Sequence, residues 1–214
     1  MAKTVYSIVL DDEVVRAVDA LAGSQGLSRS AAINRILAQH VQMDTAEQRI
    51  QDVFAVLEQM AQGSALQMLS ASDAQMQLRS PLRYKYNPNV KYQIELYGGD
   101  PDALGMFRAG MRTQNSALLD CLDGFFQLWI QLEPRYLPRP EQLRYRLERG
   151  RLLRVLRHTG AGTTADTLGE ALSEYVNLFD RCLKTYFEFR DDPQAEAAVA
   201  AVYCRGLTPV VMKL

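Results

Sequence analysis

The chain has 214 residues, of which 48% are hydrophobic and 23% charged, and its formal net charge is −1 at pH 7. This length and composition support a packed core in one large or two small domains and exclude a disordered chain. Three widely spaced cysteines and two distant histidines exclude a disulfide framework and a cysteine or histidine metal motif, so we expect no metal and no cofactor. No apolar run has the length of a membrane span and no signal peptide is recognisable, so we expect a cytoplasmic protein.

Residues 3–10, KTVYSIVL, are rich in β-branched and aromatic residues and predict a strand. Successive side chains of a strand point to opposite faces. The even-numbered residues form the more apolar face, which we expect to face a core: Thr4, Tyr6, Ile8 and Leu10. The odd-numbered residues form the outward face: Lys3, Val5, Ser7 and Val9.

Two short helices are predicted after this strand. Asp11 and Asp12 end the strand, and either can cap a helix with apolar residues at helical spacing. Those residues are Val14, Val18 and Leu21. Gly23 and Gly26 end the first helix, and Ser28 is a good N-cap for the second. The apolar stripe of the second helix is Ile33, Ile36, Leu37 and Val41.

One strand and two short helices do not make a stable monomer. A lone strand has two unpaired edges, and about forty residues bury too little apolar surface. We therefore expect a homodimer or a higher homo-oligomer, in which two strands pair antiparallel into a ribbon and four helices cover one face of it. The odd-numbered residues would then face solvent or a ligand.

Two stretches, LDDEVVRAVDALA and GLSRSAAINRIL, resemble the ribbon-helix-helix DNA-binding family of the MetJ/Arc/CopG type. In that family a leucine closes the strand, acidic or polar residues begin the first helix, and a G-x-S-[RK]-S turn begins the second. Leu10, residues 11–13 and residues 26–30 match these features. The resemblance covers residues 3–41, and we assign residues 1–42 to a DNA-binding and dimerisation module.

The resemblance also implies which residues contact DNA. The ribbon of this family enters the major groove, and three alternating outward residues contact bases. The matching residues are Val5, Ser7 and Val9. The start of the second helix holds a phosphate through backbone N–H groups. The matching residues are Ser28, Arg29 and Ser30, with Lys3 at the strand end as a further phosphate contact. Family members commonly carry a basic or other hydrogen-bonding residue on the outward face. Because two of these three residues are valines, the alternative is a module that only dimerises.

Residues 43–214 resemble no family known to us. Apolar residues at helical spacing predict helices over 44–62, 65–78, 115–133, 141–158, 168–190 and 194–204. Residues 79–97 instead alternate between apolar and polar around the Asn87-Pro88-Asn89 turn cluster and predict one β-hairpin. The expected fold class is therefore mainly α with short β (α+β). An N-terminal ribbon-helix-helix dimer module precedes a mostly helical oligomerisation or sensor domain over residues 43–214.

The near-zero net charge conceals two basic blocks. Residues 79–91 carry four basic and no acidic residues, and residues 135–157 carry eight basic and two acidic residues. The first block lies on the polar face of the predicted hairpin and is a candidate auxiliary surface for DNA or RNA: Arg79, Arg83, Lys85 and Lys91. The alternatives are a solvated hairpin face and, in the second block, arginines that are solvated or paired with acidic residues.

The sequence thus predicts a transcriptional regulator that binds double-stranded DNA sequence-specifically and acts as a repressor. The alternative is a ribbon-helix-helix dimer that serves as a protein-interaction module, antitoxin-like or adaptor-like, with weak or no DNA binding. A protein partner or a small-molecule effector would suit residues 43–214. No HExxH, GxSxG or cysteine–histidine pair is present, so we do not expect an enzyme.

Overall fold

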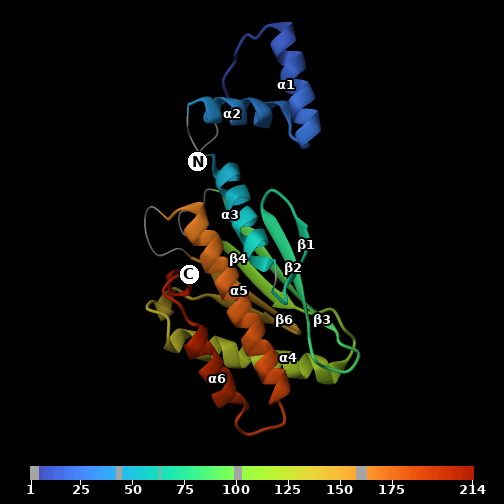
Figure 1. Ribbon diagram of the computed structural model, residues 1–214, viewed down its shortest axis with the longest axis vertical. Helices are drawn as coiled ribbons and strands as arrows, with labels where there is room; N and C mark the ends of the chain where they lie inside the picture. Colours follow the sequence, from blue (N-terminus) through green and yellow to red (C-terminus); the bar gives the residue numbers. More distant parts are fainter. Residues whose placement is uncertain (1–4, 42–44, 63, 99–102, 158–162) are drawn as a thin grey trace. The chain divides into compact units, whose positions relative to one another are not determined.

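The computed structural model describes residues 5–41, 45–62, 64–98, 103–157 and 163–214 (Figure 1). The chain divides into two compact units, Met1–Arg49 and Ile50–Leu214. Each unit has its own cluster of buried apolar side chains, and each is described by itself. Lys3, one of the predicted phosphate contacts, lies outside the described residues.

The N-terminal unit contains two helices joined by a tight turn. The first, α1 (Asp12–Gln25), ends where Gly26 adopts a left-handed conformation with φ 67°, which glycine reaches without steric strain. The second, α2 (Arg29–His40), begins at Ser28, whose hydroxyl oxygen accepts a hydrogen bond from the N–H of Ala31. The buried residues of the pair are Val18, Ala22 and Ala32. The predicted helix pair and its capping residues Gly26 and Ser28 are therefore confirmed.

The C-terminal unit is built on an antiparallel sheet of six strands among the described residues, in the order β1-β2-β3-β4-β6-β5. The strands are β1 (Gln67–Ala71), β2 (Gln75–Pro81), β3 (Asn89–Leu96), β4 (Gly105–Gly110), β5 (Tyr145–Glu148) and β6 (Arg151–Leu156). The register between β1 and β2 shifts between Met68 and Ser70, which makes a bulge in the edge strand β1.

Helices pack on one face of this sheet, and Figure 1 shows α5 crossing it. The helices are α3 (Ala46–Ala61), α4 (Ser116–Leu132), α5 (Ala165–Glu188) and α6 (Ala195–Gly206). Phe179 of α5 is central to the core. Its ring centroid lies 5.1 Å from that of Phe107 on β4 and 4.6 Å from that of Trp129 on α4. The sheet and two helices are therefore held by one aromatic cluster.

A buried ion pair links β6 to the end of α4. Arg154 and Glu133 have side-chain exposures of 0% and 1%, and Arg154 Nη2 lies 3.0 Å from Glu133 Oε1. The other carboxylate oxygen accepts hydrogen bonds from Trp129 Nε1 at 2.9 Å and from the Tyr145 hydroxyl at 2.5 Å. Burial alone would lower the pKa of Arg154, but the adjacent Glu133 carboxylate raises that pKa above its ordinary value. Arg154 therefore stays charged inside the core.

A second polar link joins the sheet to α5. The Tyr92 hydroxyl of β3 donates a hydrogen bond to Asp180 at 2.8 Å, and Lys184 Nζ lies 2.7 Å from the other oxygen of that carboxylate. Lys184 also donates to the hydroxyl of Ser80 on β2 at 2.7 Å. Burial and the Asp180 charge raise the pKa of Tyr92 well above its usual value, so Tyr92 keeps its proton and acts as a donor.

The expectation of a mostly helical C-terminal domain with one β-hairpin is wrong. Residues 65–78, predicted as a helix, form β1 and much of β2, and residues 141–158, also predicted as a helix, contain β5 and β6. The predicted hairpin 79–97 exists only as the β2–β3 pair within the larger sheet. The helices predicted over 44–62, 115–133, 168–190 and 194–204 are confirmed as α3 to α6.

A buried polar residue interrupts the strand pattern in β6 and in β2, and the one in β6 accounts for the helix predicted over residues 141–158. The inward row of β6 is Leu152, Arg154 and Leu156, and that of β2 is Met76, Leu78 and Ser80. Each row has the two-residue period of a strand, but an arginine in one row and a serine in the other interrupt the apolar pattern. The remaining leucines of residues 141–158 then match a helical spacing equally well.

Candidate nucleic-acid interface

Residues 5–10 have no strand assignment in the single chain. A strand needs a hydrogen-bonding neighbour, and the predicted neighbour is the same segment of a second chain. Val5 and Val9 of the outward face are 95% and 101% exposed, and Ser7 between them is also exposed. The pairing of two such segments stays a prediction.

The N-terminal unit exposes far more apolar surface than it buries. Both faces of residues 5–10 and both helices contribute, and α1 and α2 bury only three residues. The exposed large apolar residues are Val5, Tyr6, Ile8, Val9, Leu10, Val14, Leu21, Ile36, Leu37 and Val41. Such a concentration on fewer than fifty residues is typical of an interface rather than of a free surface.

The predicted phosphate anchor is located at the first turn of α2. The Ser28 side chain caps Ala31 N–H, and the Ser28 carbonyl accepts from Ala32 N–H at 2.9 Å. The backbone N–H groups of Arg29 and Ser30 lie in the first turn of α2, where N–H groups have no acceptor within the helix. The positive end of the helix dipole favours an anion at this position.

The Arg29 side chain is already paired within the module. Its Nε and Nη2 atoms donate to the two carboxylate oxygens of Asp19 on α1, both at 2.6 Å. The hydrogen bonds from Arg29 lower the pKa of Asp19, so this carboxylate is ionised at neutral pH. The guanidinium expected to contact phosphate is thus partly neutralised by a neighbouring anion, which the sequence analysis did not foresee.

All four residues of the predicted auxiliary surface are exposed. Arg79 and Lys91 are opposite one another in the β2–β3 register, and Arg83 and Lys85 lie in the connection between these strands. Tyr86 has a positive φ of 65° at the tip of that connection and is 99% exposed.

Sequence reasoning missed three basic residues on the same face of the sheet. Arg108, Arg146 and Arg151 project on the face that carries Arg79 and Lys91. The second basic block contained a usable signal, because Arg146, Arg149 and Arg151 flank a glycine in the manner of a hairpin turn. This signal was not recognised, because most of the second basic block was assigned to a helix.

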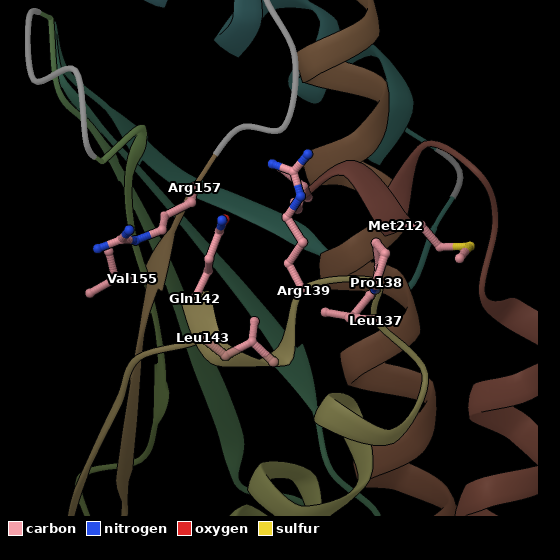
Figure 2. Close-up of a pocket in the computed structure, with 9 residues that line it drawn as sticks. Leu137, Pro138, Arg139, Gln142, Leu143, Val155, Arg157 and Met212 are labelled. Atoms are coloured by element: carbon pink, nitrogen blue, oxygen red, sulfur yellow. The ribbon is translucent and has the colours of Figure 1, made fainter.

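The hollows among the described residues of the C-terminal unit include the two described below. Figure 2 shows one of them, beside Arg139, Gln142 and Arg157; its volume of about 20 Å³ admits about one water molecule, so it is no ligand site. The other, of about 440 Å³, lies beside α5 and α6 and is lined by both polar and apolar groups. Its charged and amide side chains are Glu174, Asn177, Arg181 and Arg205. This volume is in the range of small-molecule sites.

The part of the chain that the structure describes contains no group of three metal-ligating side chains. In the same part, no helix combines the length and the apolar character that crossing a membrane requires. The three cysteines are free thiols.

Residues 7–42 match the family model described as "Ribbon-helix-helix protein, copG family". This match confirms the ribbon-helix-helix resemblance noted from the sequence for the N-terminal residues. It covers about one sixth of the chain, and no family is recognised in the remainder. Comparison with curated proteins and with solved structures gives no match.

Proposed function

We propose that this protein is a transcriptional repressor that binds operator DNA as a dimer through a ribbon made of residues 3–10 from two chains. The observation that carries the proposal is the exposed apolar surface of the N-terminal unit. Pairing of two segments would cover Tyr6, Ile8 and Leu10 with the helices of both copies, since these residues share one face of a strand. The outward residues Val5, Ser7 and Val9 would then enter the major groove.

Footprinting on the DNA upstream of the protein's own coding region tests this proposal directly. We expect protection of one or more short sites that overlap a promoter, and repression by competition with polymerase. A full-length protein that protects no sequence there, and binds no duplex more tightly than another, would contradict it. The absence of enzymatic activity and the cytoplasmic location stay predictions that accompany this proposal.

Replacing Ser7 by alanine should reduce discrimination among DNA sequences. Ser7 is the polar residue among the three outward ones, and its hydroxyl can hydrogen-bond a base edge on each half of the ribbon. Loss of two such bonds, at about 1 kcal/mol each, lowers the preference for the best site about 30-fold. Competition binding against a mixed-sequence duplex measures this ratio, and Ser24→Ala, at the end of α1, is the matched control.

Replacing Asp19 by asparagine should tighten binding to every duplex. The change removes an anion beside the phosphate anchor and releases the Arg29 guanidinium from its pair. One additional phosphate contact per chain, or two per dimer, steepens the salt dependence of affinity by about 2 in log–log slope. Fluorescence anisotropy over a salt series measures both effects.

The control for this experiment is Asp166→Asn, the same charge change on an exposed residue of α5. Arg29→Gln should have the opposite effect and weaken binding to all sequences. If Asp19→Asn and Arg29→Gln both bind DNA as the unaltered protein does, the first turn of α2 does not hold a phosphate.

A protein-interaction role is the second candidate, and one observation favours it. The outward residues Val5 and Val9 offer methyl groups rather than hydrogen-bond donors. Under this proposal the N-terminal module only dimerises, and a protein partner binds the C-terminal unit. Co-purification of a partner whose binding prevents DNA binding distinguishes the two roles. The 440 Å³ hollow beside α5 and α6 would be the place for a small-molecule effector under either proposal.

A further inference from the structure

The sheet of the C-terminal unit has one face that no helix covers. It consists of the odd-numbered residues of β2, β3 and β6 and the even-numbered residues of β4 and β5, and we call it the open sheet face. Every one of these residues is exposed or half-buried, whereas the opposite row of each of the central strands β2, β3, β4 and β6 is buried. Such an asymmetry is ordinary for an antiparallel sheet, which can face water on one side.

The strand register brings the two basic blocks of the sequence together on this face. Arg79 is opposite Lys91, Lys91 is opposite Gly110, and Gly110 is opposite Arg151. Because neighbouring strands lie about 4.8 Å apart, Lys91 and Arg151 are separated by about 10 Å across the glycine. Residues about sixty positions apart in the chain therefore form one basic row.

A second row reinforces the first. Arg108 is opposite Leu153, and Arg146 is opposite Leu153 on its other side. The open sheet face thus has five basic side chains and two acidic ones, Glu95 and Glu148, for a net charge of +3. Arg83 and Lys85, in the connection that follows β2, extend the same charge beyond the strand ends.

The acidic residues neutralise only part of this surface. Glu95 pairs with Arg108 at 2.8 Å, and Glu148 lies 3.0 Å from Arg146 and 3.5 Å from Arg151. Arg79 and Lys91 have no carboxylate within ion-pair distance among the described residues, and like charges directly opposite in a sheet are destabilising. A polyanion lying on this face would relieve that repulsion.

The neutral residues around the row suit the same ligand. Gln75, Gln77 and Gln93 are half-buried on this face, and their amides can donate hydrogen bonds to phosphate or sugar oxygens. The apolar residues of the face, Met106, Leu153 and Val155, are half-buried and form no exposed apolar patch of the kind that obligate protein interfaces bury. The chemistry of the face therefore favours a charged backbone over an apolar partner surface.

We propose that the open sheet face is a second DNA-binding surface, which contacts the sugar–phosphate backbone of a duplex independently of its sequence. This inference rests on the proposed DNA-binding function and deepens it. The N-terminal residues 1–41 have a net charge of zero and provide little long-range attraction for DNA. The open sheet face would supply that attraction and leave the choice of sequence to the ribbon.

The test compares two charge-matched triple variants of the full-length protein. The first is Arg79→Gln/Lys91→Gln/Arg151→Gln on the open sheet face. The control is Arg135→Gln/Arg139→Gln/Lys213→Gln, which removes three exposed basic side chains that lie outside the open sheet face. The probe is a fluorescent 40-bp mixed-sequence duplex, and affinity is measured by anisotropy between 50 and 200 mM salt.

With the open sheet face of one chain on the duplex, the three lost phosphate contacts should reduce the log–log salt slope by about 2.7. Over this fourfold range of salt the unaltered protein should therefore lose about 40-fold more affinity than the open-face variant does. The control variant should keep the slope of the unaltered protein. The ratio of specific to mixed-sequence binding should stay the same in both variants, because the backbone carries no sequence information.

Three other results would overturn the inference. If the unaltered protein and the open-face variant bind the duplex with the same salt slope, the face does not contact DNA, although the ribbon still can. If the open-face variant changes the sedimentation coefficient and not the affinity, the face joins copies of the chain. If it changes binding to a mixed-sequence RNA duplex and not to DNA, the ligand is RNA. Failure of the unaltered protein to bind any duplex would instead count against the proposed function itself.

Discussion

Replacing Ile8 by aspartate should dissociate the N-terminal dimer and lower DNA affinity by at least about 100-fold. In the proposed ribbon Ile8 lies on the face that the four helices cover, although it is exposed in the single chain. A dimer would bury two aspartates close to its symmetry axis, each without a partner. Burying an unpaired carboxylate costs several kcal/mol, and about 3 kcal/mol already exceeds a factor of 100.

The adjacent residue provides the matched control for Ile8. In the proposed ribbon Val9 points to the outward face, so Val9→Asp would introduce the same carboxylate without entering the dimer core. Sedimentation equilibrium and anisotropy on both variants give the two measurements needed. Dimerisation should be lost in Ile8→Asp and kept in Val9→Asp. If Ile8→Asp sediments and binds DNA as the unaltered protein does, the ribbon is not the interface.

Replacing Glu133 by glutamine should give the largest loss of stability of the changes considered. The side chain keeps its size and can still accept hydrogen bonds from Trp129 and Tyr145. The guanidinium of Arg154, however, loses its counter-charge while remaining fully buried. Removing one partner of a buried ion pair costs about 3–5 kcal/mol. Urea unfolding followed by tryptophan fluorescence measures this loss, since Trp129 lies in the same cluster.

The control and a second variant separate charge from packing. Glu170→Gln removes a carboxylate from the exposed side of α5 and should change the free energy of unfolding by less than about 0.5 kcal/mol. Adding Arg154→Met to Glu133→Gln should restore part of the lost stability, because no uncompensated charge is then buried. If the single variant is as stable as the Glu170→Gln control, the ion pair does not stabilise the core.

The sequence was sufficient for the two helices of the N-terminal unit because their signals are local. Gly26 and Ser28 act on their own neighbours through a left-handed turn and an N-cap, and the spacing of Val18 and Ala22 depends on one helix alone. The pair between Arg29 and Asp19 joins two helices, and its geometry follows from how they pack rather than from any short pattern. Because of this ion pair, the guanidinium of Arg29 that was expected to contact a phosphate is partly neutralised.

The C-terminal unit shows the opposite situation. The sheet was missed because Arg154 occupies an inward position, where a strand pattern calls for an apolar residue, and its ion pair with Glu133 becomes visible only in three dimensions. The open sheet face depends on register in the same way. Lys91 and Arg151 are neighbours only because Gly110 of β4 lies between them. Long-range strand pairing of this kind cannot be read from the hydrophobic pattern of one segment.

The bulge between Met68 and Ser70 has a consequence for molecules crowded together on one stretch of duplex. β1 is an edge strand of the sheet. Without the bulge, its unpaired N–H and C=O groups could form hydrogen bonds with a strand of the next molecule. The shifted register breaks the regular spacing of those groups within a five-residue strand. At this edge, the sheets of neighbouring molecules are therefore hindered from pairing into a fibre.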